Sequence, residues 1–233
     1  MMIFAHRGAS KLERENTLKA FAKAIELGVD GIELDVRKTV DNHLVVFHDP
    51  EINGRKICKL TFEEINRESA KENYQVPELE ESLRLIAGKA HVQIEIKEEG
   101  FEREVGEIAL KILQPGDFTI ISFNVKSLQT IKRILPQVKT GLIIGTKYGR
   151  ITQILWFAIN RKKMLVSADM FTINWKLWLS GFAKLIPPQY PLSVWTADGV
   201  TIIKSLLADN AVNCIVTNYP DRALQLKKEY EQK

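Results

Sequence analysis

Acidic side chains stand at alternate positions in two strand-like segments of the chain. In residues 31–36, Glu33 and Asp35 share one face of the expected strand, and in residues 92–96 Glu95 repeats the arrangement. Carboxylates buried close together are costly unless a cation or paired donors compensate their charge. Oxygen ligands at this spacing suit a divalent cation, Mg²⁺ or Ca²⁺. The pattern therefore indicates an acidic site that needs positive charge.

Two histidines and two basic residues could complete this site. His6 ends the first apolar run and precedes Arg7, whereas His48 ends another apolar run. An imidazole titrates near neutral pH, so one histidine could take a proton from a nucleophile while the other protonates a leaving alkoxide, typically worth ~10²–10⁴-fold in rate. Arg7 offers a planar fork of donors for phosphate oxygens, and Lys97 shares the face of Glu95. These residue types favour a phosphodiester site.

Simpler interpretations of the same residues stay open on the sequence. Arg37 lies on the face of Glu33 and Asp35 and could form a satisfied ion pair with them. Lys97 could simply neutralise Glu95. A lone histidine at a strand end is also more often structural than catalytic, and only the company of the carboxylates favours function.

Aromatic residues mark a further part of the expected site. Trp195 lies at a strand end and is expected to form a wall for the substrate, with Phe123 as a weaker candidate. The tryptophan-rich segment 171–178 invites a membrane-contact interpretation, because tryptophan favours membrane interfaces. However, Trp175 and Trp178 fall on one helical face with other apolar residues, as in a helix that packs on a barrel. Membrane contact is therefore not expected.

Length and composition limit the class of protein. A chain of 233 residues fits one α/β barrel domain, which typically has about 200–250 residues. The hydrophobic fraction of 45% and the charged fraction of 27% are those of a globular protein, and they exclude disordered, collagenous and membrane-spanning classes. Lys plus Arg, 33, barely exceeds Asp plus Glu, 29, so no nucleic-acid partner is expected. The small excess suits an anionic small-molecule substrate.

Cysteine usage and the N-terminal residues favour a cytoplasmic location. Cys58 and Cys214 are the only cysteines and form no Cys-x-x-Cys spacing, so neither a disulfide framework nor a structural zinc site is expected. The first apolar run, residues 2–5, leads directly to His6, which leaves no room for a signal peptide. The apolar stretch 151–159 ends at a basic cluster and is too short to span a membrane.

Short apolar runs alternate with stretches of helical period, as in repeated βα units. Eight parallel strands are expected, and this count predicts a TIM (β/α)8 barrel. The expected strands are Ile3–Ala5, Gly31–Val36, Val92–Ile96, Thr119–Phe123, Thr140–Gly145, Met164–Ala168, Leu192–Thr196 and Cys214–Thr217. Helices are expected from Leu18 to Gly28 and over Leu79–Ala87, Glu102–Leu113, Val125–Leu135, Ile151–Ile159, Trp175–Leu185 and Val200–Ala208. One domain, residues 1–233, is expected to hold them all.

A hairpin is expected between the second strand and the second helix of the barrel. The apolar run 44–47 follows Val36 too closely for a crossover helix, so it is expected to pair back on the second strand. A four-residue turn at 40–43 would place His48 opposite Asp35. The rest of the insertion, which covers about residues 38–75, is expected to form an excursion on the same rim of the barrel.

Several motifs in one order closely resemble the glycerophosphodiester phosphodiesterases. The resemblance covers nearly the whole chain, so it is far more specific than any one motif. Its clearest pieces are His6-Arg7-Gly8, Glu15-Asn16-Thr17, Gly31-Ile32-Glu33-Leu34-Asp35-Val36, Val45-Val46-Phe47-His48-Asp49, Glu95-Ile96-Lys97, Val194-Trp195-Thr196 and Thr217-Asn218-Tyr219-Pro220. Departures from the family pattern include Asp198, where asparagine is common, and Asn218, which replaces a common aspartate.

The resemblance implies a barrel that hydrolyses glycerophosphodiesters to sn-glycerol 3-phosphate and an alcohol with a divalent cation. By the same resemblance, Glu33, Asp35 and Glu95 are metal ligands. His6 and His48 are then the acid/base pair, and Arg7 and Lys97 hold the phosphate. Two other functions stay open: lysophospholipase D-like hydrolysis of lysolipids at the same site, and a silent barrel that only binds phosphodiesters. The order in which the histidines act is not fixed by the sequence.

Overall fold

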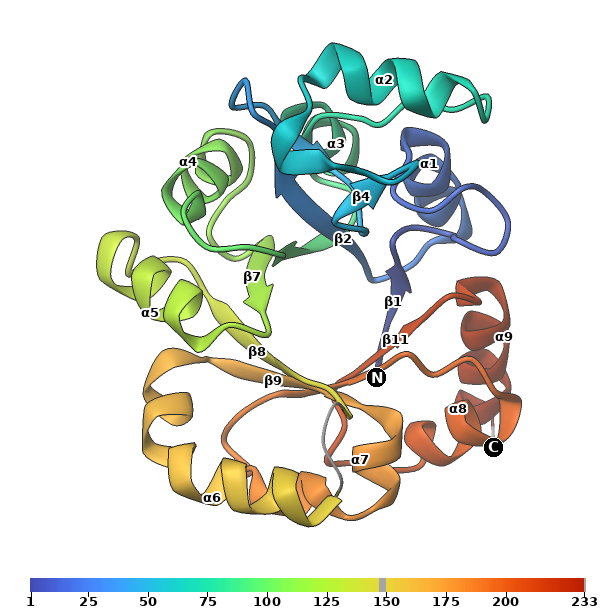
Figure 1. Cartoon of the computed structure of the whole chain (residues 1–233). Helices are drawn as coiled ribbons and strands as arrows, with labels where there is room; N and C mark the ends of the chain where they lie inside the picture. Colours follow the sequence, from blue (N-terminus) through green and yellow to red (C-terminus); the bar gives the residue numbers. More distant parts are fainter. Residues whose placement is uncertain (147–149, 233) are drawn as a thin grey trace.

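The computed structural model describes residues 1–146 and 150–232 of the chain. In these residues eight parallel strands close into a barrel, because the first strand pairs with both the second and the last. The predicted TIM barrel is thereby confirmed (Figure 1). Its strands are β1 (Met2–His6), β2 (Gly31–Lys38), β6 (His91–Ile96), β7 (Phe118–Ser122), β8 (Thr140–Ile144), β9 (Met170–Asn174), β10 (Leu192–Trp195) and β11 (Cys214–Thr217).

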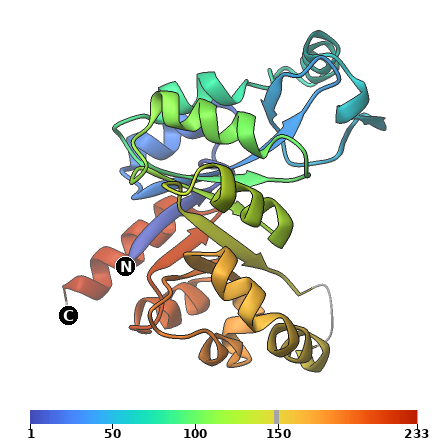
Figure 2. The same ribbon diagram turned by 90° about the vertical axis from the view of Figure 1, so that its left-hand side faces the viewer.

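Helices surround the strands, as Figures 1 and 2 show. The helix expected after residue 17 is confirmed: the Thr17 side chain accepts a hydrogen bond from the Ala20 N–H, and Gly28 ends the helix. The helices are α1 (Leu18–Leu27), α3 (Leu79–Ile86), α4 (Glu102–Ile112), α5 (Val125–Ile134), α6 (Arg150–Ser167), α7 (Trp175–Leu179), α8 (Val200–Leu207) and α9 (Pro220–Glu231). A 3-10 turn, η2 (Phe182–Leu185), follows α7, so the single helix expected over residues 175–185 is interrupted.

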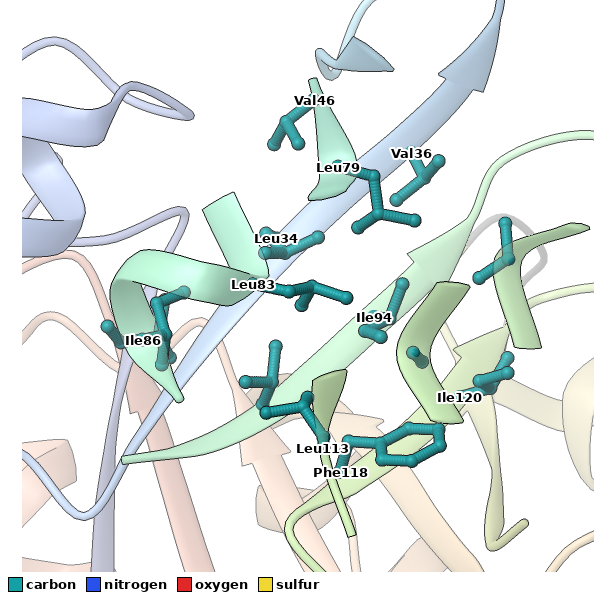
Figure 3. Packing of buried hydrophobic residues seen from close by; sticks show 14 of the residues in the cluster. Leu34, Val36, Val46, Leu79, Leu83, Ile86, Ile94, Leu113, Phe118 and Ile120 are labelled. Atoms are coloured by element: carbon teal, nitrogen blue, oxygen red, sulfur yellow. The ribbon is translucent and has the colours of Figure 1, made fainter. Parts of the chain in front are cut away.

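The main core lies between the outer face of the strands and the helices (Figure 3). Ile32, Leu34 and Val36 of β2 lie in this core, as the alternation predicts. Leu79 and Leu83 of α3 belong to the same cluster, so the buried stripe of the helix faces the strands. This packing leaves the other face of β2, with its polar residues, directed into the barrel.

The inside of the barrel is filled by side chains rather than open. Phe4, Cys214 and Val216 are buried together there, with Trp195 packed against them. Gly31 makes room for this cluster, because a Cβ at Gly31 would lie 2.4 Å from the ring of Phe4. The Phe4 ring thus fills part of the barrel interior, and the acidic side chains Glu33, Asp35 and Glu95 lie nearer the C-terminal ends of the strands.

The insertion between β2 and α3 has its own small core. Its elements are β3 (Leu44–Val46), β4 (Glu51–Ile52), β5 (Arg55–Lys56), the 3-10 turn η1 (Ile57–Lys59) and α2 (Phe62–Ala70). β3 pairs antiparallel with β2, which confirms the hairpin. Val45, Ile52 and Ile65 are buried in a cluster of the insertion. Figure 2 shows this part projecting from the barrel at the upper right.

Two details of the predicted strands are wrong. The register of the hairpin pairs Val36 with Val46, because the turn has three residues and Asn42 adopts a left-handed φ of 69°. The backbone N–H of Phe47, rather than His48, therefore lies opposite Asp35. Residues 164–167, expected to begin a strand, instead form the last part of α6. The strand is β9, six residues further along the chain.

Among the described residues, no helix is long and apolar enough to cross a membrane. The tryptophans near β9 mostly pack inward, since Trp175 and Trp178 contact the core between α6, α7 and the strands. Leu179 continues the apolar helical face predicted from Trp175 and Trp178, yet it is 64% exposed, at the last residue of α7.

Candidate active site

Strand register brings the predicted residues to one end of the barrel. His6 is aligned with Glu33 across β1 and β2, and Asp35 is aligned with Glu95 across β2 and β6. Residues aligned in this way on parallel strands point to the same face, which here is the barrel interior. Gly8 then turns the chain away from β1 with a φ of 80°, and a Cβ there would lie 2.8 Å from Ala20. The backbone can therefore pack tightly on α1.

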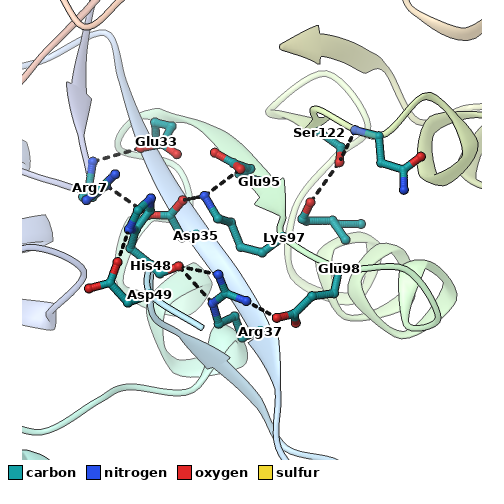
Figure 4. Close-up of polar contacts among 12 residues, drawn as sticks. Arg7, Glu33, Asp35, Arg37, His48, Asp49, Glu95, Lys97, Glu98 and Ser122 are labelled. Atoms are coloured by element: carbon teal, nitrogen blue, oxygen red, sulfur yellow. Dashed lines mark hydrogen bonds and ion pairs between the residues drawn. The ribbon is translucent and has the colours of Figure 1, made fainter. Parts of the chain in front are cut away.

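Three carboxylates converge in the interior. Glu33, Asp35 and Glu95 are all buried, and each offers an oxygen that lies within 4.8 Å of the others. Arg37 does not pair with them: its guanidinium binds Glu98 and the carbonyl of His48 (Figure 4). The alternative of a satisfied pair with Arg37 is therefore wrong.

Two basic side chains contact the carboxylates directly. The Lys97 ammonium lies 2.7 Å from Glu95 Oε1 and 3.2 Å from Asp35 Oδ1. The Arg7 Nε lies 3.1 Å from Asp35 Oδ2, and its backbone N–H donates to Glu33 Oε2 at 3.0 Å. Lys97 thus does more than neutralise Glu95, because it bridges two carboxylates.

The electrostatics of the cluster are unbalanced, because three carboxylates share two cations. Burial, followed by Asp35 and Glu95, raises the pKa of Glu33 well above its usual range. Burial and the neighbouring Asp35 raise the pKa of Glu95 to about 7. Burial alone would raise the pKa of Asp35 as well, but Lys97 and Arg7 outweigh it and hold that pKa at about 2. Further positive charge would relieve this repulsion, so the oxygen cluster fits a hard divalent cation.

His6 is held by a residue from the far end of the sequence. Its Nδ1 lies 2.7 Å from Asn218 Oδ1, and its Nε2 lies 3.8 Å from Glu33 Oε2. Burial, followed by the charge of Arg7, lowers the pKa of His6 to about 4. The ring is therefore neutral at neutral pH, as a proton acceptor must be.

His48 lies at the start of the insertion and is held from two sides. Its Nδ1 lies 2.7 Å from Asp49 Oδ1. Its carbonyl oxygen accepts hydrogen bonds from the Arg37 Nε at 2.9 Å and from a terminal Arg37 nitrogen at 2.7 Å. Burial lowers the pKa of this imidazole, although Asp35 acts in the opposite direction. Its side chain is 32% exposed, more than that of His6.

A cavity with about 100 Å³ of space joins these groups to an apolar wall. Phe123 and Trp195 stand on that wall with ring centroids 5.6 Å apart, in an edge-to-face arrangement. All of the predicted site residues except Asp35 line the cavity. The lining residues are His6, Arg7, Glu33, His48, Gln93, Glu95, Lys97, Ile121, Phe123, Ile143, Thr172, Trp195 and Val216.

Some polar residues of the site were not predicted from the sequence. Asn16 is buried, and its Nδ2 donates to Asp35 Oδ2 at 2.8 Å. Arg7 and Asn16 both adopt left-handed φ values, 57° and 55°, which are uncommon for residues other than glycine and often occur at functional sites. Asn218 contacts His6 directly, and Asp198 binds Asn218. In the sequence they stood out only as departures from the family pattern, which has asparagine where this chain has Asp198 and aspartate where it has Asn218.

The fold and site together define a TIM barrel with a cavity lined by two histidines, clustered carboxylates and two basic side chains. Residues 6–222 match the profile of the glycerophosphoryl diester phosphodiesterase family, and the chain belongs to this family. The predicted family membership is confirmed.

Named relatives are similar to this chain in sequence, and a solved structure is similar to it in fold. The chain is 39% identical over 164 residues to a glycerophosphodiester phosphodiesterase of Caldanaerobacter subterraneus subsp. tengcongensis, a match that covers 61% of this chain and 66% of the relative. It is 28% identical over 253 residues to one of Bacillus altitudinis, with 97% and 98% of the chains covered. Its fold is similar to that of an Oleispira antarctica phosphodiesterase solved with the product sn-glycerol-3-phosphate, with a TM-score of 0.79, 20% identity and coverage of 98% and 97%.

Proposed function

We propose that this protein hydrolyses glycerophosphodiesters to sn-glycerol 3-phosphate and an alcohol, with a divalent cation and two histidines. The observation that carries the proposal is the cavity itself: it is lined by two histidines, clustered carboxylates, an arginine and a lysine. Family membership and the product bound to the Oleispira antarctica phosphodiesterase support the substrate class.

Glu33, Asp35 and Glu95 would hold the cation, since their oxygens cluster within 4.8 Å. When bound, a divalent cation supplies charge stabilisation for the phosphate and for an ionising hydroxyl. We assign either Mg²⁺ or Ca²⁺, because both prefer carboxylate oxygens. Arg7 and Lys97 flank the carboxylates and would bind phosphate oxygens through charge-assisted hydrogen bonds.

The two histidines would transfer the protons of the reaction. One imidazole takes the proton of the glycerol 2-hydroxyl as its oxygen bonds to phosphorus. The other gives a proton to the leaving alcohol as the bond between that oxygen and phosphorus breaks. Water then attacks the cyclic phosphate with the two roles exchanged, which gives sn-glycerol 3-phosphate and restores both rings. In His6 and His48 the Nδ1 is held by a side-chain oxygen, so the Nε2 is the atom available for this transfer.

The test is release of sn-glycerol 3-phosphate from glycerophosphocholine and glycerophosphoethanolamine. We expect turnover with added Mg²⁺ or Ca²⁺ and its loss in a chelator, and a loss of at least 100-fold in His6→Ala and His48→Ala. His43→Ala is the matched control, because His43 faces Thr39 across the hairpin and binds Glu78 outside the cavity. Full activity in chelator would contradict the role of the cation. Turnover of lysolipids alone would contradict the substrate class.

We further infer a cytoplasmic location and one domain with an insertion at about residues 38–75. In support of the location, Cys58 and Cys214 are both free thiols, as is usual in a reducing compartment. In support of one domain, the insertion continues the barrel sheet through the pairing of β3 with β2. Detection of the native protein in the soluble cytoplasmic fraction, with its thiols reduced, would test the location.

A further inference from the structure

A chain of hydrogen bonds runs beneath His6, outside the groups that contact the substrate cavity. It begins at Asp198, in the loop after β10, and reaches His6 through Asn218, which directly follows β11. The Asn218 Nδ2 donates to Asp198 Oδ2 at 2.8 Å, and the Asn218 backbone N–H donates to Asp198 Oδ1 at 2.9 Å. Neither residue lines the cavity. Their contact with a residue that lines the cavity is the one between Asn218 and His6.

The carboxylate of Asp198 fixes which way the Asn218 amide faces. An ionised carboxylate only accepts hydrogen bonds, so the amide nitrogen of Asn218 must face Asp198. The amide oxygen must then face the opposite way, where it accepts a hydrogen bond from the Ser10 hydroxyl at 3.0 Å. The same oxygen lies 2.7 Å from His6 Nδ1. Because this oxygen cannot donate, Nδ1 of His6 must carry the proton.

We propose that Asp198 is a positioning residue that acts through Asn218 to hold His6 in the tautomer with a proton on Nδ1 and an open Nε2. The open Nε2 faces the carboxylate cluster, 3.8 Å from Glu33 Oε2. The inference rests on the proposed function, in which Nε2 of His6 exchanges a proton with the substrate. The carboxylate of Asp198 is suited to this role because its oxygens also accept the Thr217 hydroxyl at 3.1 Å, which fixes its own orientation.

Asp198→Asn is expected to reverse the donors and acceptors along this series of hydrogen bonds. The new amide has one accepting oxygen, which the backbone N–H of Asn218 already occupies, so its NH₂ group faces the Asn218 side chain. Asn218 then turns its oxygen toward position 198 and its NH₂ toward His6. His6 must accept at Nδ1 and carry its proton on Nε2. We expect kcat to fall at least 10-fold with KM changed less than about 2-fold, because the substrate contacts are retained.

The exchange variant separates this role from a structural one. In Asp198→Asn/Asn218→Asp, the amide at 198 donates to the carboxylate introduced by N218D, which accepts from His6 Nδ1 as the wild-type amide does. We expect kcat to return to within about 3-fold of wild type. Asp209→Asn is the matched control, because Asp209 also accepts side-chain and backbone N–H groups but contacts Trp178 and Ala211, away from the cavity.

Nitrogen NMR of the histidine rings reports the tautomer without any turnover. The chain has only four histidines, so single replacements assign the His6 signals. At a pH where the ring is neutral, we expect the proton on Nδ1 in wild type and in the exchange variant, and on Nε2 in Asp198→Asn. Wild-type kcat in Asp198→Asn, or an unchanged tautomer in that variant, would overturn the proposal.

The same measurements distinguish failure of this inference from failure of the proposed function. If wild type released no sn-glycerol 3-phosphate from any glycerophosphodiester, the proposed function would fail, while the NMR signals would still decide the tautomer. If wild type is active and Asp198→Asn keeps both its activity and its Nδ1 proton, only the positioning role is lost. Thermal melts of each variant show that it is folded before either result is used.

Discussion

At the scale of single residues, Glu33 shows most clearly what the clustered carboxylates cost. Glu33 has a buried carboxylate with Asp35 and Glu95 as close neighbours, and its pKa is raised because burial and these charges disfavour its ionised form. Such an arrangement costs free energy of folding until positive charge reaches it. On the proposed function, stability and activity are therefore opposed at Glu33.

Glu33→Gln is expected to stabilise the metal-free protein while it abolishes activity. The substitution keeps the size of the side chain and removes the carboxyl whose ionisation is disfavoured by burial and by its two acidic neighbours. We expect the melting temperature in chelator to rise by about 2–4 °C, which corresponds to roughly 1 kcal/mol in a chain of this length. Turnover should fall at least 100-fold, and added Mg²⁺ should no longer raise the melting temperature. Glu81→Gln, an exposed position on α3, is the control. A lower melting temperature in Glu33→Gln would contradict the interpretation.

The two cysteines are expected to differ sharply in reactivity. Cys58 is exposed, whereas Cys214 lies inside the barrel, where burial raises the pKa of its thiol to about 12. Because the thiolate is the reactive form, one thiol per chain should react with a disulfide reagent in the native state and two in denaturant. Cys58→Ser should leave no fast-reacting thiol. Rapid reaction of both thiols in the native protein would show that the barrel interior is open.

At this scale the sequence predicted the residues that share a strand face, but not those that meet through loops. Glu33, Asp35 and Glu95 follow from an alternation of period two, which the strands obey. Arg37 follows the same alternation, yet its partners are Glu98 and the His48 carbonyl, both in connections after strands. No local sequence pattern predicts contacts between a strand residue and residues in distant loops. The interpretation of Arg37 failed for that reason.

At the scale of elements, the insertion depends on one arginine at its base. The Arg37 guanidinium is buried and donates twice to the carbonyl of His48, at the point where the chain leaves the hairpin. A planar fork can make both bonds and still reach Glu98, whereas a lysine ammonium is a compact point charge. Arg37 thus fixes the position of His48 by binding the backbone carbonyl of that residue.

Arg37→Lys is expected to reduce turnover about 10-fold without weakening cation binding. Loss of one buried, charge-assisted hydrogen bond costs about 1.5–3 kcal/mol, and part of this cost should appear in the activation barrier. Amide exchange should accelerate in residues 47–60 and stay unchanged in β6. Arg103→Lys, an exposed ion pair on α4, should change neither quantity. Wild-type kcat in Arg37→Lys would contradict the role of the guanidinium in placing His48.

The errors in the predicted elements have physical causes. Met164–Ala168 is a short apolar run, and such a run fits a buried strand and the end of a buried helix equally well. The true strand, β9, instead has Thr172 directed into the cavity, so it looks less like a core strand. The predicted register of the hairpin is wrong by one residue, because Asn42 takes a left-handed conformation and the turn is shorter than expected. Helix α9 was not expected because it is rich in charged residues, which leaves only a narrow apolar stripe.

At the scale of the whole molecule, the packing inside the barrel depends on a close fit between the Phe4 ring and Gly31. Phe4 fills the space that Gly31 leaves open on the neighbouring strand, where a Cβ would lie 2.4 Å from the ring. Contacts of this kind are not additive, because each change alters the space available for the other.

Phe4 and Gly31 should therefore be strongly coupled in a double-mutant cycle. We expect Phe4→Ala to lower the free energy of unfolding by about 3–5 kcal/mol and Gly31→Ala to lower it by about 1–3 kcal/mol. In the double variant the second cost should largely disappear, which urea unfolding can measure. Gly116→Ala is the control, since a Cβ there meets nothing within 4 Å. Additive costs would mean that the ring does not set the size limit at Gly31.

The last barrel strand, β11, pairs with the first, β1, and brings Asn218 to His6. His6 and Asn218 are 212 positions apart, and β1 is enclosed only when β11 pairs with it. A chain still emerging from the ribosome can therefore hold its histidines and carboxylates for most of its synthesis while the ring of His6 is unoriented. On the proposed function, the complete site can form only after β11 has been synthesised and has paired with β1. Partly synthesised chains are therefore expected to be inactive.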